Sequence, residues 1–393
     1  MQRISQIDTI LENLEKQQAI PFNKPFLTGY ENYYLSMVFS SGKLAGDGFF
    51  TKQCENFFNR KFNFRNSLLV TSCTHALEMS ALLMQLKPGD EVIIPSFTFV
   101  STANAFMLFG AKIVFADSRK DHPGIDESSL ESLITKRTKA IVVVHYAGVA
   151  CDMDKIMAVA HKNNLFVVED TAHGIDAYYH GRPLGSIGDM GTFSFHETKN
   201  ITCGEGGLLN VSNEELLGRA EIIREKGTDR SKFLRGEIDK YSWVGIGSSY
   251  VLSEMNAAFL LAQLEQLEKI QAQRLAVWHY YYEGLKELEI EGLVKLPVVP
   301  KYASNNAHIF YMVLKSEEQR QDLILYLKSK NIHSVFHYSS LHTSQFFTAY
   351  HDGRNLPNSD FYTDGLLRLP LYCELTQDQS LRIVEEIQNY FKL

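Results

Sequence analysis

The sequence predicts an α/β protein built on a large, mostly parallel sheet, and two features of the chain support this prediction. Short runs rich in valine and isoleucine alternate with helical patterns from about residue 66 to residue 170. Some of these runs, such as 139–148, are apolar almost throughout, which is typical of strands that are buried on both faces of a parallel sheet. Strands and helices that alternate along one chain indicate the α/β class.

The elements of this first part follow from the spacing of its apolar residues. The stretch 74–86 places Leu77, Ala81 and Met84 on one face, at the spacing of an amphipathic helix. Strands are expected where several apolar residues run together and turn residues follow them. These patterns predict strands at 66–72, 91–100 (which includes a turn), 111–117, 139–148 and 164–170, and helices at 74–86, 102–109 and 153–163.

The pattern changes near residue 190. Residues 188–211 read as two short strands around a polar turn that contains GEGG, and a long helical region follows at about 253–286. From about residue 295, the strand signals AHIFYMVL and HSVFHY accompany helical patterns and predict a smaller α+β domain. We therefore expect an N-terminal extension at 1–19, a large domain at 20–270 and a small C-terminal domain at 271–393, with helices in the last at 317–330 and 377–391.

Composition excludes several classes of function. The chain has 393 residues and a net charge of −7, without a long basic run, so neither nucleic acid nor an anionic membrane is expected as a partner. Five scattered cysteines without a CxxC pair argue against a disulfide framework and a structural zinc site. Residues 1–18 predict a short amphipathic helix without the apolar core of a signal peptide. The apolar runs are too short to cross a bilayer, and we expect a cytoplasmic protein.

The first candidate binding feature is the start of a helix at Ser72, Cys73 and Thr74, directly after a predicted strand. Ligands of α/β proteins collect at the carboxyl ends of parallel strands. A helix N-terminus offers free N–H groups and the positive end of the helix dipole, so it can hold a phosphate. Small residues at a helix start more commonly serve only as caps. This feature alone therefore leaves both interpretations open.

The second feature is Asp170, which ends the apolar strand in VVED at 167–170. A carboxylate at such a position is unfavourable unless it meets a cation or a hydrogen-bond donor. The commoner role of a single aspartate there is to cap the following turn. The functional alternative is a partner for a protonated pyridine nitrogen, which keeps the ring of a cofactor able to withdraw electrons.

The third feature is Lys199, which follows an apolar strand in SFHETKN and precedes the turn GEGG at 204–207. Most lysines are solvated surface charges. A lysine that is desolvated beside a cationic ring has a lowered pKa and becomes a nucleophile that can bond covalently to a carbonyl carbon. His196 lies three positions earlier, and a packed or hydrogen-bonded histidine is the better interpretation of it. The motifs GxGxxG, GxxxxGK[ST] and HExxH are absent, which disfavours nucleotide-redox, P-loop and zinc-hydrolase functions.

Four motifs follow one another along the chain: SCTHALE, PSFTFVSTANA, VVEDTAHG and FSFHETKNITCGEGG, and SGKLAGDG, HYAGVACDMD, REKGTDRS and VFHYSSLH accompany them. Together they resemble the DegT/DnrJ/EryC1/StrS family of sugar aminotransferases. The likeness runs from about residue 20 to the C-terminus, and several motifs in the right order are far more specific than one.

The resemblance implies fold type I of the enzymes that depend on pyridoxal 5′-phosphate, and a homodimer with active sites between the subunits. By the same resemblance, Lys199 holds the cofactor covalently and later moves a proton to the sugar carbon, and Asp170 pairs with the pyridine nitrogen. His173 stands where many relatives carry a glutamine near the ring hydroxyl, and Phe99 matches the aromatic residue that stacks on the ring.

The resemblance also implies how the cofactor phosphate is held. The backbone N–H groups of Cys73 and Thr74 and the hydroxyl of Ser194 match the family's phosphate cradle. One position departs from the common pattern. Many relatives reach the neighbouring subunit's phosphate with an asparagine, and here IGSSYVLSE (246–254) places Ser249 in that position. A serine hydroxyl reaches less far, so the contact between subunits is in doubt.

The implied reaction is transamination of TDP-4-keto-6-deoxy-D-glucose with L-glutamate, giving TDP-4-amino-4,6-dideoxy-D-galactose. The alternatives are a related nucleotide-sugar aminotransferase that makes the gluco epimer or acts at C3, a sugar 3-dehydratase, and a non-catalytic binding protein on the same scaffold. The lysine in HETKN argues against the dehydratase, since the relatives of that kind carry histidine there. A binding protein would be expected to have lost Lys199 or Asp170, and both are present.

Overall fold

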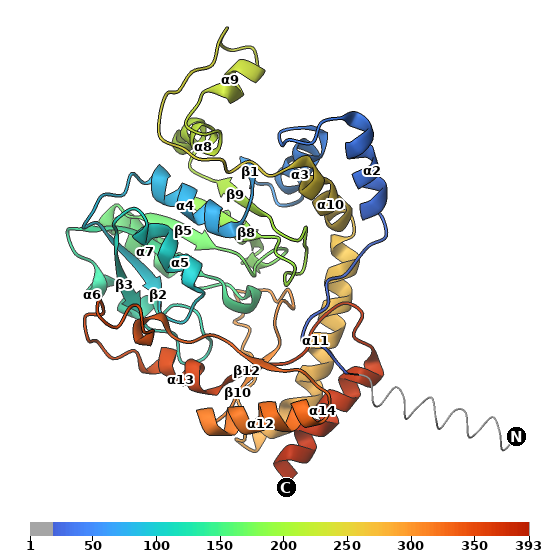
Figure 1. Cartoon of the computed structure of the whole chain (residues 1–393). Helices are drawn as coiled ribbons and strands as arrows, with labels where there is room; N and C mark the ends of the chain where they lie inside the picture. The colour runs from blue at the N-terminus through green and yellow to red at the C-terminus, as the bar shows by residue number, and fades with distance from the viewer. Residues whose placement is uncertain (1–18, 393) are drawn as a thin grey trace, which may run out of the picture.

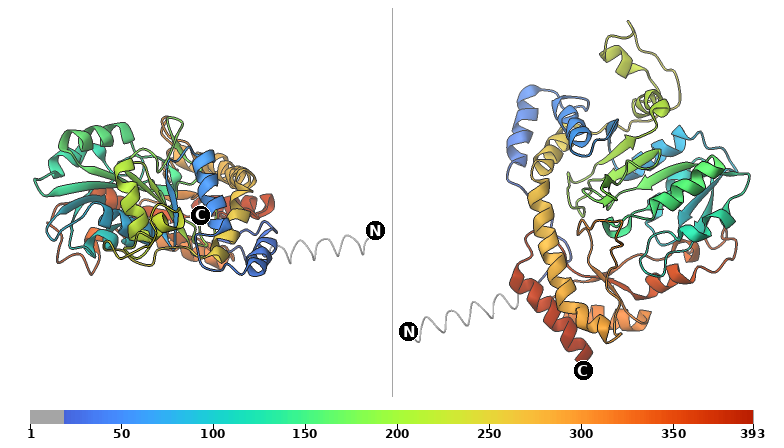
Figure 2. Two further views of the ribbon diagram at one scale, coloured as in Figure 1. Left: turned by 90° about the horizontal axis from the view of Figure 1, so that it is seen from above. Right: turned by 180° about the vertical axis from the view of Figure 1, so that it is seen from behind.

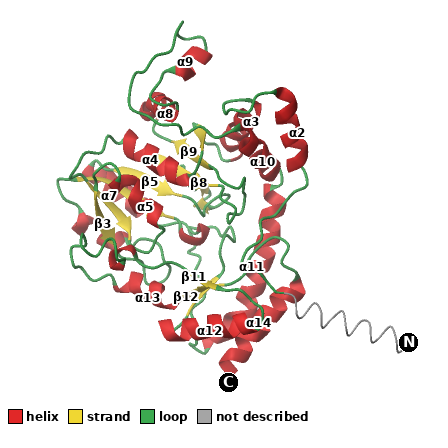
Figure 3. Ribbon diagram, in the orientation of Figure 1, coloured by secondary structure: helices red, strands yellow, loops and turns green. Residues whose placement is uncertain are grey.

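The computed structural model describes residues 19–392, so the helix predicted for residues 1–18 lies outside the described part. A sheet of seven strands forms the centre of the larger part of the chain (Figures 1 and 3). All neighbouring strands are parallel except at β9, which is antiparallel to both of its neighbours. The predicted α/β class with a mostly parallel sheet is confirmed. In spatial order the strands are β1 (Ser67–Val70), β9 (Gly207–Val211), β8 (Met190–Ser194), β5 (Phe166–Asp170), β4 (Thr138–Val144), β2 (Glu91–Pro95) and β3 (Lys112–Ala116).

The strand register brings the ends of three strands together. Val144 of β4 pairs with Asp170 of β5, and Asp170 pairs with Thr192 of β8. Parallel strands finish at the same edge of a sheet, and this edge is where α/β proteins bind their ligands. The register therefore places Asp170 beside the turn that leaves β8 and carries Lys199.

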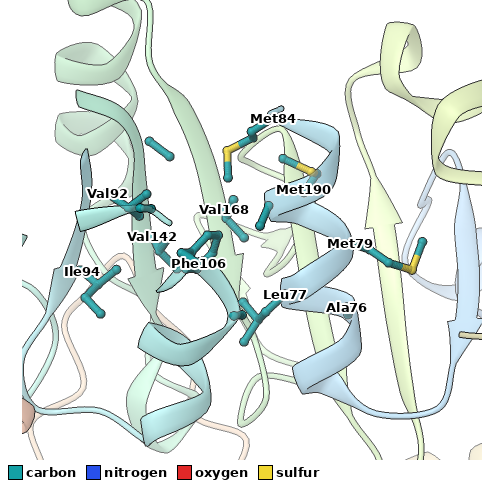
Figure 4. Packing of buried hydrophobic residues seen from close by; sticks show 14 of the residues in the cluster. Ala76, Leu77, Met79, Met84, Val92, Ile94, Phe106, Val142, Val168 and Met190 are labelled. Carbon is teal, nitrogen blue, oxygen red and sulfur yellow. The ribbon is translucent and has the colours of Figure 1, made fainter. Parts of the chain in front are cut away.

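Helices cover both faces of the sheet, which explains the almost fully apolar strands. On one face, α4 (Cys73–Leu83) and α5 (Val100–Met107) pack through Leu77 and Phe106 onto Val142 and Val168 (Figure 4). On the other face, α7 (Met153–Asn163) covers the alternate residues of the same strands. Successive side chains of a strand point to opposite faces, so both sets must be apolar.

Several predicted elements differ from the observed ones in their limits. The strand expected at 139–148 ends at Val144, and residues 146–148 form a short 3-10 turn. The backbone turns away because Ala147 has a φ of 58° and Gly148 a φ of 78°, which lie in the left-handed region that favours glycine. The helical region expected at 253–286 is two helices, α10 (Glu254–Leu264) and α11 (Leu267–Ile290).

The helices α2 (Glu31–Ser41) and α3 (Phe49–Lys61) pack beside α10 (Figure 1). Glu254, the first residue of α10, accepts backbone N–H groups of Phe50 at 2.8 Å and Thr51 at 3.0 Å. These N–H groups belong to the first turn of α3 and have no partner within that helix. One buried carboxylate therefore caps a helix more than 200 residues away and joins the N-terminal segment to the rest of the fold.

The C-terminal part is built around α11, which runs from the large sheet to a second, smaller one (Figure 2). Ile20 lies in the core of this part and forms a bridge with Ile332. The division of the chain near residue 270 stays a prediction. The smaller sheet has the antiparallel order β10 (Tyr311–Val313), β12 (Leu366–Arg368) and β11 (Val335–Phe336), and the helices around it are α12 (Glu317–Ser329), α13 (Pro357–Gly365) and α14 (Gln377–Lys392).

Candidate active site

A cavity of about 650 Å³ opens at the carboxyl edge of the parallel strands. Its wall comes from both sheets: the ends of β4, β5 and β8, the start of α4, and strands β11 and β12 of the smaller sheet. A volume of this size is typical of small-molecule sites. Seven of the eight residues that the sequence indicates line it: Cys73, Thr74, Phe99, Asp170, His173, Ser194 and Lys199.

Lys199 lies in the turn between β8 and β9. The turn is closed by backbone hydrogen bonds: Phe195 donates to Gly206 and Cys203 donates to Phe195, each at 2.9 Å. No carboxylate of the described residues forms an ion pair with the Lys199 amine. Burial, helped by the positive charge of Arg368, lowers the pKa of Lys199 to about 8. A useful fraction of the amine is therefore unprotonated near neutral pH and can act as a nucleophile.

Asp170 is held by two hydrogen bonds that leave it facing the cavity. Its Oδ2 accepts the hydroxyl of Thr102 at 2.8 Å, and its Oδ1 accepts the backbone N–H of Ala172 at 3.1 Å. Burial raises the pKa of this carboxyl above its ordinary value because a charge removed from water is unfavourable, and the charges of Lys199 and His145 oppose that shift only in part. A cationic ligand group at Asp170 would relieve that cost, which fits a protonated pyridine nitrogen.

The start of α4 fits a phosphate. The Ser72 hydroxyl caps the helix by accepting the N–H of His75 at 3.1 Å, while no acceptor among the described residues takes the N–H groups of Cys73 and Thr74. A side chain at Gly207 would come within 2.3 Å of the Ser72 backbone, so glycine is required for β9 to pack against this turn. A helix N-terminus with two free N–H groups at a cavity wall can hold an anion.

His173 has a defined tautomer. Its Nδ1 accepts the backbone N–H of Ala147 at 3.2 Å, so the proton of the neutral ring lies on Nε2. Burial holds the pKa of His173 well below its ordinary value, with the charges of Lys199 and Arg368 acting in the same direction. The ring therefore offers a single N–H donor, and a hydroxyl or oxyanion of a cofactor ring would be its natural partner.

Phe99 presents an apolar surface to the cavity. It is the residue before α5, it is 53 % exposed, and its ring centroid lies 6.0 Å from that of Tyr338. The exposed ring belongs to one of the residues that line the cavity. It provides a face on which a planar cofactor ring can stack.

Glu169, next to Asp170, is a fully buried carboxylate that organises the wall behind the cavity. It accepts backbone N–H groups from Gly185 at 2.9 Å and from Ile187 and Gly188 at 2.7 Å, and it contacts Nε2 of His145 at 2.9 Å. His145 accepts the N–H of Cys151 at Nδ1, so Nε2 is the donor to Glu169. Although burial opposes it, these hydrogen bonds hold the pKa of Glu169 below its ordinary value.

His196 and Ser249 lie in different surroundings. His196 also lines the cavity, and its Nδ1 lies 3.0 Å from the Thr198 hydroxyl, as expected for a hydrogen-bonded histidine. Ser249 does not line the cavity of its own chain; it is exposed beside Glu225, with which it forms a bridge. Its assignment to the cavity of a neighbouring subunit stays a prediction.

The structure adds cavity residues that local sequence patterns do not reveal. Arg368 comes from β12 and Phe22 from the segment before α2. His308 donates from Nδ1 to the Asn200 side chain at 2.7 Å, since the Asn200 amide group is itself donating elsewhere. His337 and Tyr338 fall within VFHYSSLH, so the resemblance was the one signal that could have indicated them.

Comparisons with known proteins show the family of the chain. The model of the DegT/DnrJ/EryC1/StrS aminotransferase family matches residues 27–388. A protein of Methanocaldococcus jannaschii with no assigned function is 32 % identical over 347 residues, which cover 86 % of this chain and 89 % of that protein.

Solved structures share the whole fold. The aminotransferase TlmJ of Streptoalloteichus hindustanus superposes with a TM-score of 0.87 at 26 % identity, covering 95 % of this chain and 98 % of that one. DesV of S. venezuelae gives 0.84 at 29 % identity, covering 95 % and 99 %. The PLP form of Spr1654 of Streptococcus pneumoniae gives 0.87 at 25 % identity, covering 95 % and 98 %.

Proposed function

Because this chain belongs to the DegT/DnrJ/EryC1/StrS aminotransferase family, whose cofactor is pyridoxal 5′-phosphate, we propose that it aminates a nucleotide-linked 4-keto sugar. The substrate we infer is TDP-4-keto-6-deoxy-D-glucose, the amino donor is L-glutamate, and the product is TDP-4-amino-4,6-dideoxy-D-galactose. One observation supports catalysis above all others. Lys199 and Asp170, which a non-catalytic relative would not need to retain, line a single cavity with an anion site.

The polar and aromatic groups that line the cavity match the chemical groups of the cofactor. The free N–H groups at the start of α4, with the Ser194 hydroxyl on the same wall, would hold the phosphate. Asp170 would meet the pyridine nitrogen, the Nε2–H of His173 the ring hydroxyl, and Phe99 the ring face. Bound there, pyridoxal phosphate supplies an electron sink for the carbon that loses or gains the amino group.

The protein's own contribution is to hold charge and move protons. Asp170 would pair in its ionised form with the pyridine nitrogen, and its hydrogen bonds to Thr102 and Ala172 hold its orientation. Lys199, with a pKa of about 8, can take up a proton and return it near neutral pH. In the second half of the reaction it would deliver that proton to C4 of the sugar, and the face from which it does so sets the configuration of the amine.

The choice of the 4-keto substrate is supported by the extent of the sequence resemblance, which includes motifs from both parts of the chain. The same resemblance suggests a role in polysaccharide biosynthesis, of the kind that makes enterobacterial common antigen. The gluco epimer and amination at C3 are the alternatives, and they would need only a different orientation of the sugar over the same residues. No helix within residues 19–392 is long and apolar enough to cross a membrane.

We also propose that the enzyme is a homodimer in which Ser249 serves the neighbouring cavity. The segment around Ser249 carries large apolar side chains at its surface: Trp243 is 80 % and Ile246 76 % exposed. It is continuous with α8 (Leu217–Arg224) and α9 (Arg230–Leu234), which project from the large sheet (Figure 1). Exposed apolar patches of this kind mark interfaces between proteins.

The function is tested with purified protein, TDP-4-keto-6-deoxy-D-glucose and L-glutamate. We expect 2-oxoglutarate and an amino sugar in equal amounts. In the proton NMR spectrum, small couplings of H4 to its neighbours identify the axial amine of the galacto product. Large couplings would identify the gluco alternative, and an amine on C3 the other one. If the protein consumes glutamate with the cofactor but aminates no 4-keto or 3-keto nucleotide sugar, the proposed substrate class is wrong.

Asp170→Asn separates the catalytic role of this residue from a capping role. Asparagine keeps the shape and can still accept the N–H of Ala172, so a capping residue would tolerate the change. We expect each half-reaction, followed in single turnover, to slow by about 10²-fold or more, because the charge at the pyridine nitrogen is lost. Thermal unfolding checks that the fold is intact. If the variant keeps more than about a tenth of the normal kcat, Asp170 only caps the following turn and has no catalytic role.

Ser249→Ala tests the contact between subunits, with the neighbouring exposed residue Ser248→Ala as the matched control. Loss of one hydrogen bond to a phosphate should weaken cofactor binding by about 1.5–3 kcal/mol and leave the rate at saturating cofactor unchanged. By linkage, the cofactor should also strengthen dimerisation, which sedimentation at several concentrations measures. Normal cofactor affinity in the variant, together with equal dimer constants with and without cofactor, would mean that Ser249 makes no such contact.

A further inference from the structure

Asn200, which directly follows Lys199, is a buried amide whose nitrogen and oxygen both have protein partners. Its amide group donates to the side chain of Gln271 at 2.8 Å and to the carbonyl of Asn306 at 2.9 Å. Its oxygen accepts the Nδ1 proton of His308 at 2.7 Å. A buried polar network in which each member is satisfied holds a single arrangement. The backbone beside Lys199 is therefore tied to a segment that lies 108 residues further along the chain.

The segment that carries His308 is itself held by the long helix α11. Arg274 of this helix donates to the carbonyls of Ala307 at 3.1 Å and His308 at 2.9 Å, and Trp278 donates to the carbonyl of Ile309 at 3.2 Å. Side chains four positions apart lie on one face of a helix, so the two side chains bind consecutive carbonyls of one segment. The backbone of His308 is thus fixed, and its ring has a defined origin.

The ring of His308 also lies against the ring of His173, with the centroids 4.3 Å apart and the planes at 33°. Asn306 supports this contact, since its amide donates to the carbonyl of His173 at 2.7 Å and its oxygen accepts the N–H of His308 at 3.1 Å. A side chain at Gly148 would lie 1.9 Å from that oxygen, so glycine is required there. One histidine therefore contacts both the support of Lys199 and the ring of His173.

His308 makes these contacts as a neutral ring. Burial lowers its pKa well below the ordinary value, and the charges of neighbouring side chains act in the same direction. The neutral ring carries its proton on Nδ1, where Asn200 accepts it. His308 can therefore hold the turn of Lys199 without adding a positive charge to the cavity that it lines.

We propose that His308 is a positioning residue with two separable contacts: its Nδ1–H holds Asn200, and through it the turn of Lys199, while its ring holds the face of His173. This inference rests on the proposed aminotransferase function but does not depend on which sugar is the acceptor. The two contacts use different parts of the imidazole, so different substitutions remove them. A residue that only filled the core would not separate them.

Two variants divide the contacts. His308→Phe keeps a ring against His173 but has no donor for Asn200. His308→Asn places an amide N–H near the position of Nδ1 and removes the ring. We expect the first variant to disturb Lys199 and the second to disturb His173.

Competitive labelling of the full chain, freed of cofactor, with a trace of acetic anhydride measures the titration of Lys199 when the peptides are quantified by mass spectrometry. The wild-type protein should show a midpoint near the pKa of about 8 that burial produces. Without the bond to Asn200 the turn loosens and water reaches the amine. In His308→Phe the midpoint should therefore rise by about one unit or more, whereas His308→Asn should retain the wild-type midpoint.

Nitrogen-15 NMR of protein labelled at histidine follows the rings themselves. In the wild-type protein, His308 should be neutral with its proton on Nδ1, and His173 neutral with its proton on Nε2. The pKa of His173 should rise toward its ordinary value in His308→Asn, because the ring that helps to exclude water is gone, and should stay low in His308→Phe. The wild-type tautomers decide the question even if a variant does not fold.

Kinetics of the cofactor-loaded enzyme give a third measurement. His308→Phe should lower the rate of the glutamate half-reaction at saturation about tenfold or more and change KM less than about threefold, because a misdirected amine affects the chemical step more than binding. His122→Phe is the matched control. His122 is 2 % exposed against 4 % for His308, accepts the N–H of Gly124 at Nδ1 and lies outside the cavity. Its variant should lose stability without changing the Lys199 midpoint or the rate.

An unchanged Lys199 midpoint or normal glutamate kinetics in a folded His308→Phe protein would overturn the proposal. Equal midpoint shifts in both His308 variants would do the same, because the donor to Asn200 would then not matter. A wild-type His308 with its proton on Nε2 would also contradict it. If no keto sugar reacts while the labelling results are as expected, the proposed acceptor is wrong and this inference stands.

Discussion

The buried carboxylate of Glu169 is the constraint on which the rest of the site depends. It accepts three backbone N–H groups of the turn at 185–188 and the proton of His145, so it joins β5, the end of β4 and the entry to β8 in one arrangement. Successive residues of a strand face opposite ways. Fixing Glu169 toward the turn therefore fixes Asp170 toward the cavity, and it sets where β8 leads into the turn that carries Lys199.

Around this anchor, the cavity combines charges that the protein does not pair with one another. Neither Asp170 nor Arg368 forms an ion pair among the described residues, and burial destabilises the charged form of the Lys199 amine. We expect Asp170 to meet the pyridine nitrogen of the cofactor and Lys199 its carbonyl carbon.

The sequence predicted much of this arrangement because the signals are local. Apolar runs such as 164–170 identify buried strands, and Asp170 and Lys199 follow strand ends, where α/β proteins place ligands. Arg368 could not be found in this way, since its position depends on how the small sheet packs against an edge formed nearly 200 residues earlier. The end of β4 at Val144 was missed because the left-handed backbone at Ala147 depends on contacts with His173. Ser249 is a different case, because its predicted partner is on another chain.

The central claim is that Lys199 is the residue that bonds to the cofactor. Reduction of the purified yellow protein with borohydride, followed by digestion and mass spectrometry of the peptides, tests it directly. We predict that the reduced cofactor is found on the peptide that contains Lys199, and that the Lys199→Ala variant carries none under the same treatment. A reduced adduct on any other lysine, or an undiminished adduct in the variant, would contradict the account.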